Sequence, residues 1–379
     1  MSGPQGARLE ALIARVAPGT ILRHGLERML RAQTGGLVVV GDTPELRPLL
    51  SGGFRIGVLV TAQRLSELAK MDGAIVIDAD AQTILWGNVH LMPDRSIQTA
   101  EAGTRHRTAE RVARQTGLPV ISVSKSMHVV TLYVGTERYV MPAITELHAR
   151  AGQTLQALER YRDRFDEAVR GLNAMEVADE VTLGDAVHVL ARGEMLHRLA
   201  AELDRYLMEL GVEGRVGRLQ AEELMAGVGA ERLLLVRDYI GGDRAALQAP
   251  QPGRSGRAVH AGTDGQDREE AVLRALEQLS PEALFEPMTL ARLLNRPCGG
   301  ADDLDSSVSP RGFRLLSKVP RLGTEGAEQV VERFGSLARL LAAGPDELDD
   351  IEGIGPNRVK ILRNGLSWLE EVGAGRRYV

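Results

Sequence analysis

Residues 103–110 of this 379-residue chain read Gly-Thr-Arg-His-Arg-Thr-Ala-Glu, and this stretch decides how the first third of the chain is interpreted. Arg105, His106 and Arg107 open a predicted helix that ends near Gln115. A helix N-terminus carries free amides and positive dipole charge, so each basic side chain there costs about 0.3–1 kcal/mol. A bound polyanion would remove that cost, because backbone amides and guanidinium groups together form a phosphate site. The stretch therefore predicts a nucleotide ligand.

The sequence around this stretch alternates helical and extended patterns, which is typical of an α/β domain. Amphipathic helices are predicted near residues 8–16 and 20–32. Short apolar runs flanked by Gly, Asp and Thr predict buried strands at Leu37–Val40, Ile56–Val60, Ala74–Ile77, Val120–Val123 and Val129–Val134. A break at 135–137 predicts a hairpin, and Pro142 ends the domain. We expect a mixed sheet with flanking helices over residues 1–145.

A carboxylate forms the second part of the predicted site. Asp72-Gly73-Ala74 stands at the entrance to an apolar strand, where Gly73 would let a ligand approach the backbone and Asp72 could bind a metal or accept a hydroxyl proton. A plain turn at Asp72-Gly73 and a solvated basic turn at 105–107 are the simpler alternatives. Together, a carboxylate and a phosphate-binding helix end suffice for metal-assisted chemistry on a nucleoside triphosphate. The chain has no P-loop and no Gly-x-Gly-x-x-Gly after a strand, so a different kind of triphosphate enzyme is indicated.

Asp72-Gly73-Ala74 and Gly103-Thr-Arg-His-Arg-Thr108, about thirty residues apart, resemble the paired signatures of the diadenylate cyclase family. The resemblance covers about residues 10–145. It implies that the 3′-hydroxyl of one ATP attacks the α-phosphate of another, twice, to give cyclic di-AMP and two pyrophosphates, with Mg²⁺ or Mn²⁺ as cofactor. Because each domain would hold one ATP, it also implies that two domains meet face to face.

The same resemblance implies roles for individual residues. Asp72 would bind the metal and activate the hydroxyl, and Arg105, His106 and Arg107 would act on the triphosphate. The expected ATP-binding residues are Gly73, Ala74, Leu91, Thr104, Thr108, Ser124 and Lys125. Of these, Leu91 would face the adenine, and Ser124 and Lys125 would lie near the phosphates.

From Ile144 the apolar spacing becomes helical, and it stays helical to Tyr239. We therefore expect an all-α linker domain over residues 146–295, whose acidic excess is most simply a solvated face. Within it, residues 240–270 carry almost no large apolar side chain and are predicted to be a mobile linker. A Gly/Asp/Ser-rich gap at 298–309 separates a helical segment at 281–295 from the C-terminal module.

The C-terminal module, residues 310–379, carries a second signal. Residues 348–361 fit a helix-hairpin-helix pattern, in which the amides of a Gly-Ile-Gly turn and the next helix start hold a DNA phosphate without reading sequence. The expected DNA-binding residues there are Gly353, Ile354, Gly355, Asn357, Arg358 and Lys360. A helical hairpin that only packs is the alternative.

A weaker copy of this pattern, residues 319–323, precedes it by 32 residues. Arg321 replaces the first glycine of the pattern, so either Arg321 contacts DNA through its side chain or the copy is structural.

This order of domains resembles the bacterial DNA integrity scanning protein family. The resemblance implies an octamer that binds branched DNA and lowers its cyclase activity on binding. The long, polar 240–270 segment leaves the coupling between the two ends open. A rival from another class is a DNA-junction-binding structural protein whose N-terminal domain senses nucleotide without catalysis. A nuclease or ligase accessory factor finds no support, because the sequence shows neither a clustered acidic metal site nor a lysine nucleophile motif.

The composition excludes several other classes. The net charge is −5 and no third of the chain is strongly basic, so any DNA contact must be local. No apolar run approaches the roughly 20 residues that span a bilayer, and the N-terminus does not read as a signal peptide, so we expect a cytoplasmic protein without a membrane partner. Cys298 is the only cysteine, which excludes intrachain disulfides and cysteine-rich zinc sites and is more often an idle residue than a nucleophile.

Overall fold

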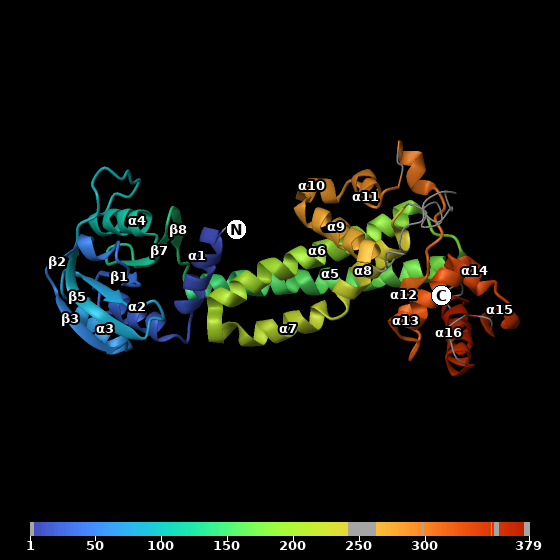
Figure 1. Cartoon of the computed structure of the whole chain (residues 1–379), viewed down its shortest axis with the longest axis horizontal. Coiled ribbons are helices and arrows are strands. Elements are labelled where there is room, and N and C mark those ends of the chain that lie inside the picture. The colour runs from blue at the N-terminus through green and yellow to red at the C-terminus, as the bar shows by residue number, and fades with distance from the viewer. Residues whose placement is uncertain (1–3, 242–262, 297–298, 350, 352–355, 375–379) are drawn as a thin grey trace, which may run out of the picture. The chain divides into compact units, whose positions relative to one another are not determined.

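The computed structural model describes residues 4–241, 263–296, 299–349, 351 and 356–374 (Figure 1). The chain divides into two compact units. Unit 1 comprises residues 1–155 and 202–220, and unit 2 comprises residues 156–201 and 221–379. Over the described residues, no helix combines the length and the apolar character that a membrane crossing requires.

Unit 1 is built on a mixed sheet with the strand order β2-β5-β4-β1-β6-β7-β8, and β3 pairs with β5. The strands are β1 (Gly36–Val40), β2 (Leu50–Ser51), β3 (Phe54–Leu59), β4 (Ala74–Ile77), β5 (Thr83–Leu91), β6 (Val120–Ser124), β7 (Val129–Val134) and β8 (Glu137–Val140). β1 and β4 run parallel, whereas β6 runs antiparallel to β1. The predicted α/β domain with a mixed sheet is confirmed, and so is the hairpin that joins β7 to β8.

Helices cover both faces of this sheet (Figure 1). α1 (Pro4–Arg15), α2 (Ile21–Arg31) and α3 (Ala62–Leu68) pack on one face, and α4 (Thr104–Thr116) packs on the other. Side chains of β1 alternate between the two cores, so the whole strand is buried. Burial on both faces explains why β1 reads as a continuous apolar run.

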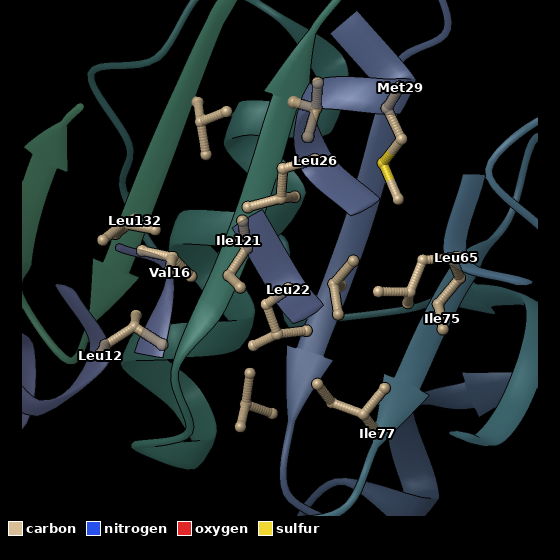
Figure 2. Close-up of a cluster of buried hydrophobic side chains, with 14 of the residues drawn as sticks. Leu12, Val16, Leu22, Leu26, Met29, Leu65, Ile75, Ile77, Ile121 and Leu132 are labelled. Atoms are coloured by element: carbon tan, nitrogen blue, oxygen red, sulfur yellow. The ribbon is translucent and has the colours of Figure 1, made fainter. Parts of the chain in front are cut away.

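The larger core of unit 1 lies under α1, α2 and α3. Figure 2 shows Leu22, Leu26 and Met29 of α2 in one cluster with Ile75, Ile77 and Ile121 of the central strands. Each of these six side chains is almost completely buried. This packing fixes the central strands, and with them the sheet edge at which β1 and β4 begin.

Strand β5 is the one long strand that the sequence does not predict. Gly87 and Asn88 interrupt its apolar alternation, and Asn88 adopts a positive φ of 52°. The pairing register shifts along β5 against two of its three partner strands, β3 and β4. A bulged strand loses the strict two-residue period that sequence reading relies on.

Among the described residues the chain is mainly helical beyond Ile144, as predicted as far as Tyr239. The helices are α5 (Ile144–Ala178), α6 (Leu183–Leu210), α7 (Arg215–Met225), α8 (Val228–Tyr239), α9 (Thr263–Gln278), α10 (Pro281–Leu284), α11 (Pro287–Leu293), α12 (Phe313–Ser317), α13 (Gly323–Phe334), α14 (Leu337–Leu341), α15 (Pro345–Asp349) and α16 (Pro356–Ala374). The boundary between the two units falls inside α5, α6 and α7.

The expected linker at 240–270 is longer than the structure supports. The Gly241 N–H donates to the Leu294 carbonyl at 2.6 Å, and α9 begins at Thr263. The first turns of α9 are polar, which is why composition alone assigned them to a linker. Residues 242–262 lie outside the described part of the chain. The expected gap at 298–309 contains a short 3-10 helix, Ala301–Asp305.

The C-terminal helices share one apolar core whose residues repeat at the 32-residue spacing seen in the sequence. Buried side chains occupy matched positions in the two copies, namely Leu316 and Leu348, Val319 and Ile351, Ala327 and Val359, and Val330 and Leu362, and all are at most 5% exposed. Equal burial at equal spacing means that the two copies use the same faces of their helices.

Candidate active site

Helix α4 begins at the predicted place and with the predicted charge. Its N-cap residue, Gly103, offers no side-chain hydrogen bond, and its first turn holds no acidic residue. The start of α4 therefore presents amides without a side-chain cap, together with basic side chains, as an anion site requires.

A hollow of about 490 Å³ lies at this helix start. Its walls come from the end of α2, the start of α4 and the turn after β6, and its lining residues are Gln33, Gly103, Thr104, Arg105, His106, Val123, Ser124, Lys125, Ser126 and His128. It brings together Thr104, Arg105, His106, Ser124 and Lys125, five of the residues expected from the sequence. Arg105 and Lys125 give the hollow positive charge.

The sequence did not reveal three polar residues of this lining, Gln33, Ser126 and His128. Gln33 and His128 both adopt a φ of 51°, a backbone conformation that sequence patterns outside Gly and Asn do not signal. The hydroxyl of Ser124 accepts a hydrogen bond from the Met127 N–H at 3.3 Å, so it holds the turn that carries Lys125 and Ser126. The Ser-Lys-Ser sequence after a buried strand could have indicated that this turn contributes polar residues to the site.

The two predicted parts of the site meet in the structure. The Arg105 guanidinium donates to Asp72 Oδ1 at 2.7 Å, although the two residues are far apart in sequence. They meet because β4 begins, β6 ends and α4 begins at the same edge of the sheet. The Asp72 side chain is 92% exposed, so its carboxylate is open to a ligand.

Gly35 makes room for Arg105. A Cβ atom on Gly35 would collide with the Arg105 guanidinium and would lie 3.3 Å from the Val123 carbonyl oxygen. We expect Gly35→Ala to displace Arg105 and to weaken ATP binding roughly 10- to 100-fold, the worth of a charge-assisted hydrogen bond. Isothermal titration measures this. Gly152→Ala is the matched control, because a Cβ on Gly152 meets nothing within 4 Å. Equal affinity in both variants would contradict this role of Gly35.

Packing within the sheet is one reason for a glycine at position 73, and the expected ligand contact of Gly73 stays a prediction. A Cβ on Gly73 would overlap the backbone of Asn88 in the neighbouring strand. Ala74 and Leu91 are buried in the core beneath α4. None of Gly73, Ala74 and Leu91 belongs to the lining of the hollow.

Two further expected residues lie outside the hollow. Arg107 is exposed and Thr108 donates its hydroxyl to the Thr104 carbonyl at 3.0 Å. Arg107 is absent from the lining of the hollow, whereas Arg105, two residues earlier on α4, belongs to it. Of the three basic residues that open α4, Arg105 and His106 line it.

His106 is buried, at 6% exposure, and the Nδ1 side of its ring is held by a hydrogen bond. Its Nδ1 lies 2.8 Å from the Tyr133 phenolic oxygen. The Tyr133 hydroxyl in turn donates to Glu101 Oε1 at 2.8 Å, and Arg138 pairs with the same carboxylate oxygen at 2.5 Å. Burial lowers the pKa of His106, so the imidazole is neutral near pH 7.

A metal ion would rely on Asp72. Among the described residues, no group of three or more His, Cys, Asp or Glu side chains is placed to hold one. A single exposed carboxylate still fits Mg²⁺ or Mn²⁺, because these ions are commonly held by one or two carboxylates and by substrate phosphates.

The candidate DNA surface is described in part. Asn357, Arg358 and Lys360 are exposed in the first turns of α16. Arg321 is exposed at the turn between α12 and α13 and adopts a φ of 66°. Gly353, Ile354 and Gly355 lie outside the described residues.

Two family models match consecutive parts of the chain. The DisA bacterial checkpoint controller nucleotide-binding family matches residues 23–138, which contain the hollow and Asp72. The DisA bacterial checkpoint controller linker region matches residues 141–251.

Curated relatives match over nearly the full length. The DNA integrity scanning protein DisA of Acidothermus cellulolyticus is 47% identical over 372 residues, which are 98% of this chain and 96% of that protein. The DisA protein of Frankia alni is 47% identical over 380 residues and 100% of both chains. The DisA protein of Symbiobacterium thermophilum is 46% identical over 355 residues, 94% of each. The chain therefore belongs to the DNA integrity scanning protein DisA family, and it is an enzyme of the diadenylate cyclase class, a nucleotidyltransferase.

Proposed function

We propose that this chain condenses two ATP molecules into cyclic di-AMP and two pyrophosphates, and that branched DNA bound by its C-terminal module lowers this activity. The observation that carries the catalytic half is the pair formed by Arg105 and Asp72 at the edge of a polar hollow. A cation for the triphosphate and a carboxylate for the hydroxyl stand next to each other there.

The triphosphate would occupy the hollow. The amides at the start of α4, the Arg105 guanidinium and the Lys125 ammonium attract its negative charge, and the hydroxyls of Thr104 and Ser126 can donate to its oxygens. In each transfer a bond forms between the 3′-oxygen of one ATP and the α-phosphorus of the other. The bond from that phosphorus to the bridging oxygen breaks, and pyrophosphate leaves. Asp72 would accept the hydroxyl proton.

Mg²⁺ or Mn²⁺ would be held by Asp72 together with phosphate oxygens of the substrate. When bound, the ion neutralises part of the charge on the phosphate under attack. Arg105 would keep the carboxylate oriented through its hydrogen bond to Oδ1.

Two copies of the domain are needed, because the nucleophile and the phosphate belong to different ATP molecules. The surface beside the hollow suits such a pairing. Met71 and Met127, which flank Asp72 and Ser126, are 42% and 59% exposed. Exposed apolar side chains next to a reactive carboxylate are typical of an interface. We propose face-to-face pairing of these surfaces within an octamer, so an isolated single copy would be inactive.

The function is tested with the purified full-length chain, ATP and either Mg²⁺ or Mn²⁺. We expect cyclic di-AMP by mass spectrometry, and we expect less of it when a four-way DNA junction is added. No product with either metal, from protein that still binds ATP and the junction, would favour the structural, nucleotide-sensing alternative.

The DNA-binding half of the proposal rests on the two copies in the C-terminal module. Their buried residues match at a spacing of 32 positions. Arg321 holds a left-handed backbone conformation at the position that Gly353 occupies in the second copy. The turn geometry of a glycine is thus present in the first copy, and a cationic side chain is added to it.

Arg321→Asn tests the first copy without disturbing its turn, because Asn tolerates a positive φ. We expect junction affinity to fall roughly tenfold, and the slope of log K against log salt to decrease by about 1, as for one lost phosphate contact. Fluorescence anisotropy over a salt series measures both. Arg333→Gln, an exposed change at the other end of α13, is the control. An unchanged affinity and slope in Arg321→Asn would make the first copy structural.

A further inference from the structure

His106 is the end of a hydrogen-bonded chain that runs away from the hollow through three other elements of unit 1. His106 Nδ1 and the Tyr133 oxygen of β7 are 2.8 Å apart, and the Tyr133 hydroxyl donates at 2.8 Å to Glu101 Oε1, which precedes α4. Arg138 of β8 fixes Glu101 through an ion pair of 2.5 Å. The hairpin of β7 and β8 and the segment before α4 together hold one imidazole ring.

The hydrogen atoms available to this hydrogen-bonded chain determine which nitrogen of the His106 ring is protonated. Burial and the neighbouring carboxylate raise the pKa of Tyr133, so the phenol keeps its proton. That single proton is donated to Glu101, so the Tyr133 oxygen can only accept from His106. His106 Nδ1 must therefore carry a hydrogen, and a neutral ring leaves Nε2 with a free lone pair.

His106 Nε2 is buried and makes no hydrogen bond within the described structure. The adjacent Cδ2 atom lies 3.4 Å from the place where a Cβ of Gly103 would stand, and both residues line the hollow. The Cδ2 edge of the ring thus lies near the start of α4, and Nε2 is the ring atom bonded to Cδ2. A buried nitrogen without a partner costs free energy unless a ligand supplies one.

We propose that Tyr133, Glu101 and Arg138 are positioning residues, which hold His106 in the Nδ1–H form. When the triphosphate binds, Nε2 takes up one proton from solvent, keeps it, and donates a hydrogen bond to a phosphate oxygen. This inference rests on the proposed function, because it needs a triphosphate in the hollow. Phosphate oxygens only accept hydrogen bonds, so Nε2 can hold one only after protonation.

The charges around the ring suit a proton that arrives with the ligand. Tyr133 on β7 is neutral and links His106 to the Glu101 carboxylate. The negative charge of Glu101 favours the protonated form of the His106 ring. Arg138 on β8 disfavours the protonated form of the ring. The hollow contains further basic groups, those of Arg105, Lys125 and His128. Without a ligand the ring stays neutral. A triphosphate would reverse this balance, because its negative charges lie next to Nε2.

The pH dependence of ATP binding follows with a definite sign. Binding raises the pKa of His106 from its depressed value in the free protein. ATP affinity is therefore constant below the free pKa, falls up to tenfold per pH unit between the free and bound pKa values, and levels off above the bound value.

Nitrogen NMR of the protein labelled in histidine tests the proposal directly. In the free wild-type chain we expect His106 as the neutral Nδ1–H tautomer. With Mg²⁺ and a non-cleavable α,β-methylene analogue of ATP, we expect both nitrogens to be protonated. Titration calorimetry near pH 7.5 in two buffers with different ionisation enthalpies should give uptake of about one proton per nucleotide. A ring that keeps the Nε2–H tautomer when free, or that stays neutral when nucleotide is bound, would overturn the proposal.

Tyr133→Phe removes only the hydroxyl. We expect the neutral Nδ1–H signature to be lost, proton uptake to fall below half, and KM for ATP to rise about tenfold with a smaller change in kcat. Glu101→Gln should reduce proton uptake as well. Tyr139→Phe is the matched control, since Tyr139 also donates to a half-buried carboxylate of unit 1, that of Glu209 at 2.6 Å, away from the hollow. Proton uptake that is equal in Tyr133→Phe and Tyr139→Phe would also overturn the proposal.

These outcomes separate the inference from the function on which it rests. A chain that makes cyclic di-AMP with no change in the state of His106 refutes the positioning chain alone. A chain that binds the nucleotide analogue, protonates His106 and yet makes no cyclic di-AMP supports the positioning chain and refutes the cyclase assignment of this site. A chain that binds no nucleotide refutes both.

Discussion

Asp72→Asn should abolish cyclic di-AMP synthesis, with a loss of at least about 10²- to 10⁴-fold, the range for removal of a general base. Asn has nearly the same size and can still accept the Arg105 hydrogen bond, but it lacks the charge that binds a cation and takes a proton. Because the Asp72 side chain is 92% exposed, the melting temperature should stay the same. Product by mass spectrometry and thermal unfolding measure the two effects.

Asp80→Asn serves as the control for Asp72→Asn, since Asp80 is an exposed acid of the same unit that is remote from the hollow. It should retain full activity. Activity near that of the wild type in Asp72→Asn would remove Asp72 from the mechanism. A loss of activity together with a large fall in melting temperature would mean that Asp72 acts on the fold instead.

Arg314→Met should destabilise unit 2 by about 3–5 kcal/mol, the usual cost of breaking a buried ion pair. The Arg314 side chain is completely buried and pairs with Glu176 at 2.9 Å and with Glu231. It also donates to Asn173 Oδ1 at 2.8 Å. Methionine fills similar space but leaves the buried Glu176 without this cation and leaves Glu231 with only the longer ion pair to Lys318, at 3.9 Å. For a unit of this size the melting temperature should fall by about 6–20 °C, and junction binding should weaken with it.

The control for this change is Arg339→Met, because Arg339 is exposed and its backbone N–H donates to Ser336. It should shift the melting temperature by no more than about 2 °C. Adding Glu176→Gln and Glu231→Gln to Arg314→Met should restore part of the stability, because the carboxylate charges that have lost this cation are then removed. A fall of less than 2 °C in Arg314→Met would show that the carboxylates find another partner.

Much of unit 1 could be predicted because its central strands are buried on both faces. β4 and β7 begin and end at the predicted residues, and β1 and β6 differ by one residue. The predictions failed at β5, where bulges break the alternation, and at the first turns of α9, which are polar. In both places the local pattern is weak and contacts with other elements decide the conformation.

The candidate site was predictable as a set of elements, but not in the direction of every side chain. The sequence placed Arg105 and Asp72 together, and the structure joins them at 2.7 Å. It treated His106 as a free phosphate ligand, although His106, Ala109 and Ala113 repeat every three to four residues on the buried face of α4. That period was the signal for a ring turned toward the core. Tyr133 and Glu101 could not be found, because only the folded sheet brings them to His106.

The border between the two units runs through α5, α6 and α7, and this has a consequence for how such a protein could evolve or be dissected. The residues of the catalytic unit form one compact body, but they come from two separate segments of the sequence. Recombination that carried residues 1–145 alone into a new protein would leave behind residues 202–220, including the Glu209 carboxylate that holds Tyr139. The transferred domain would lose this hydrogen bond, so a dissected catalytic unit should keep both segments.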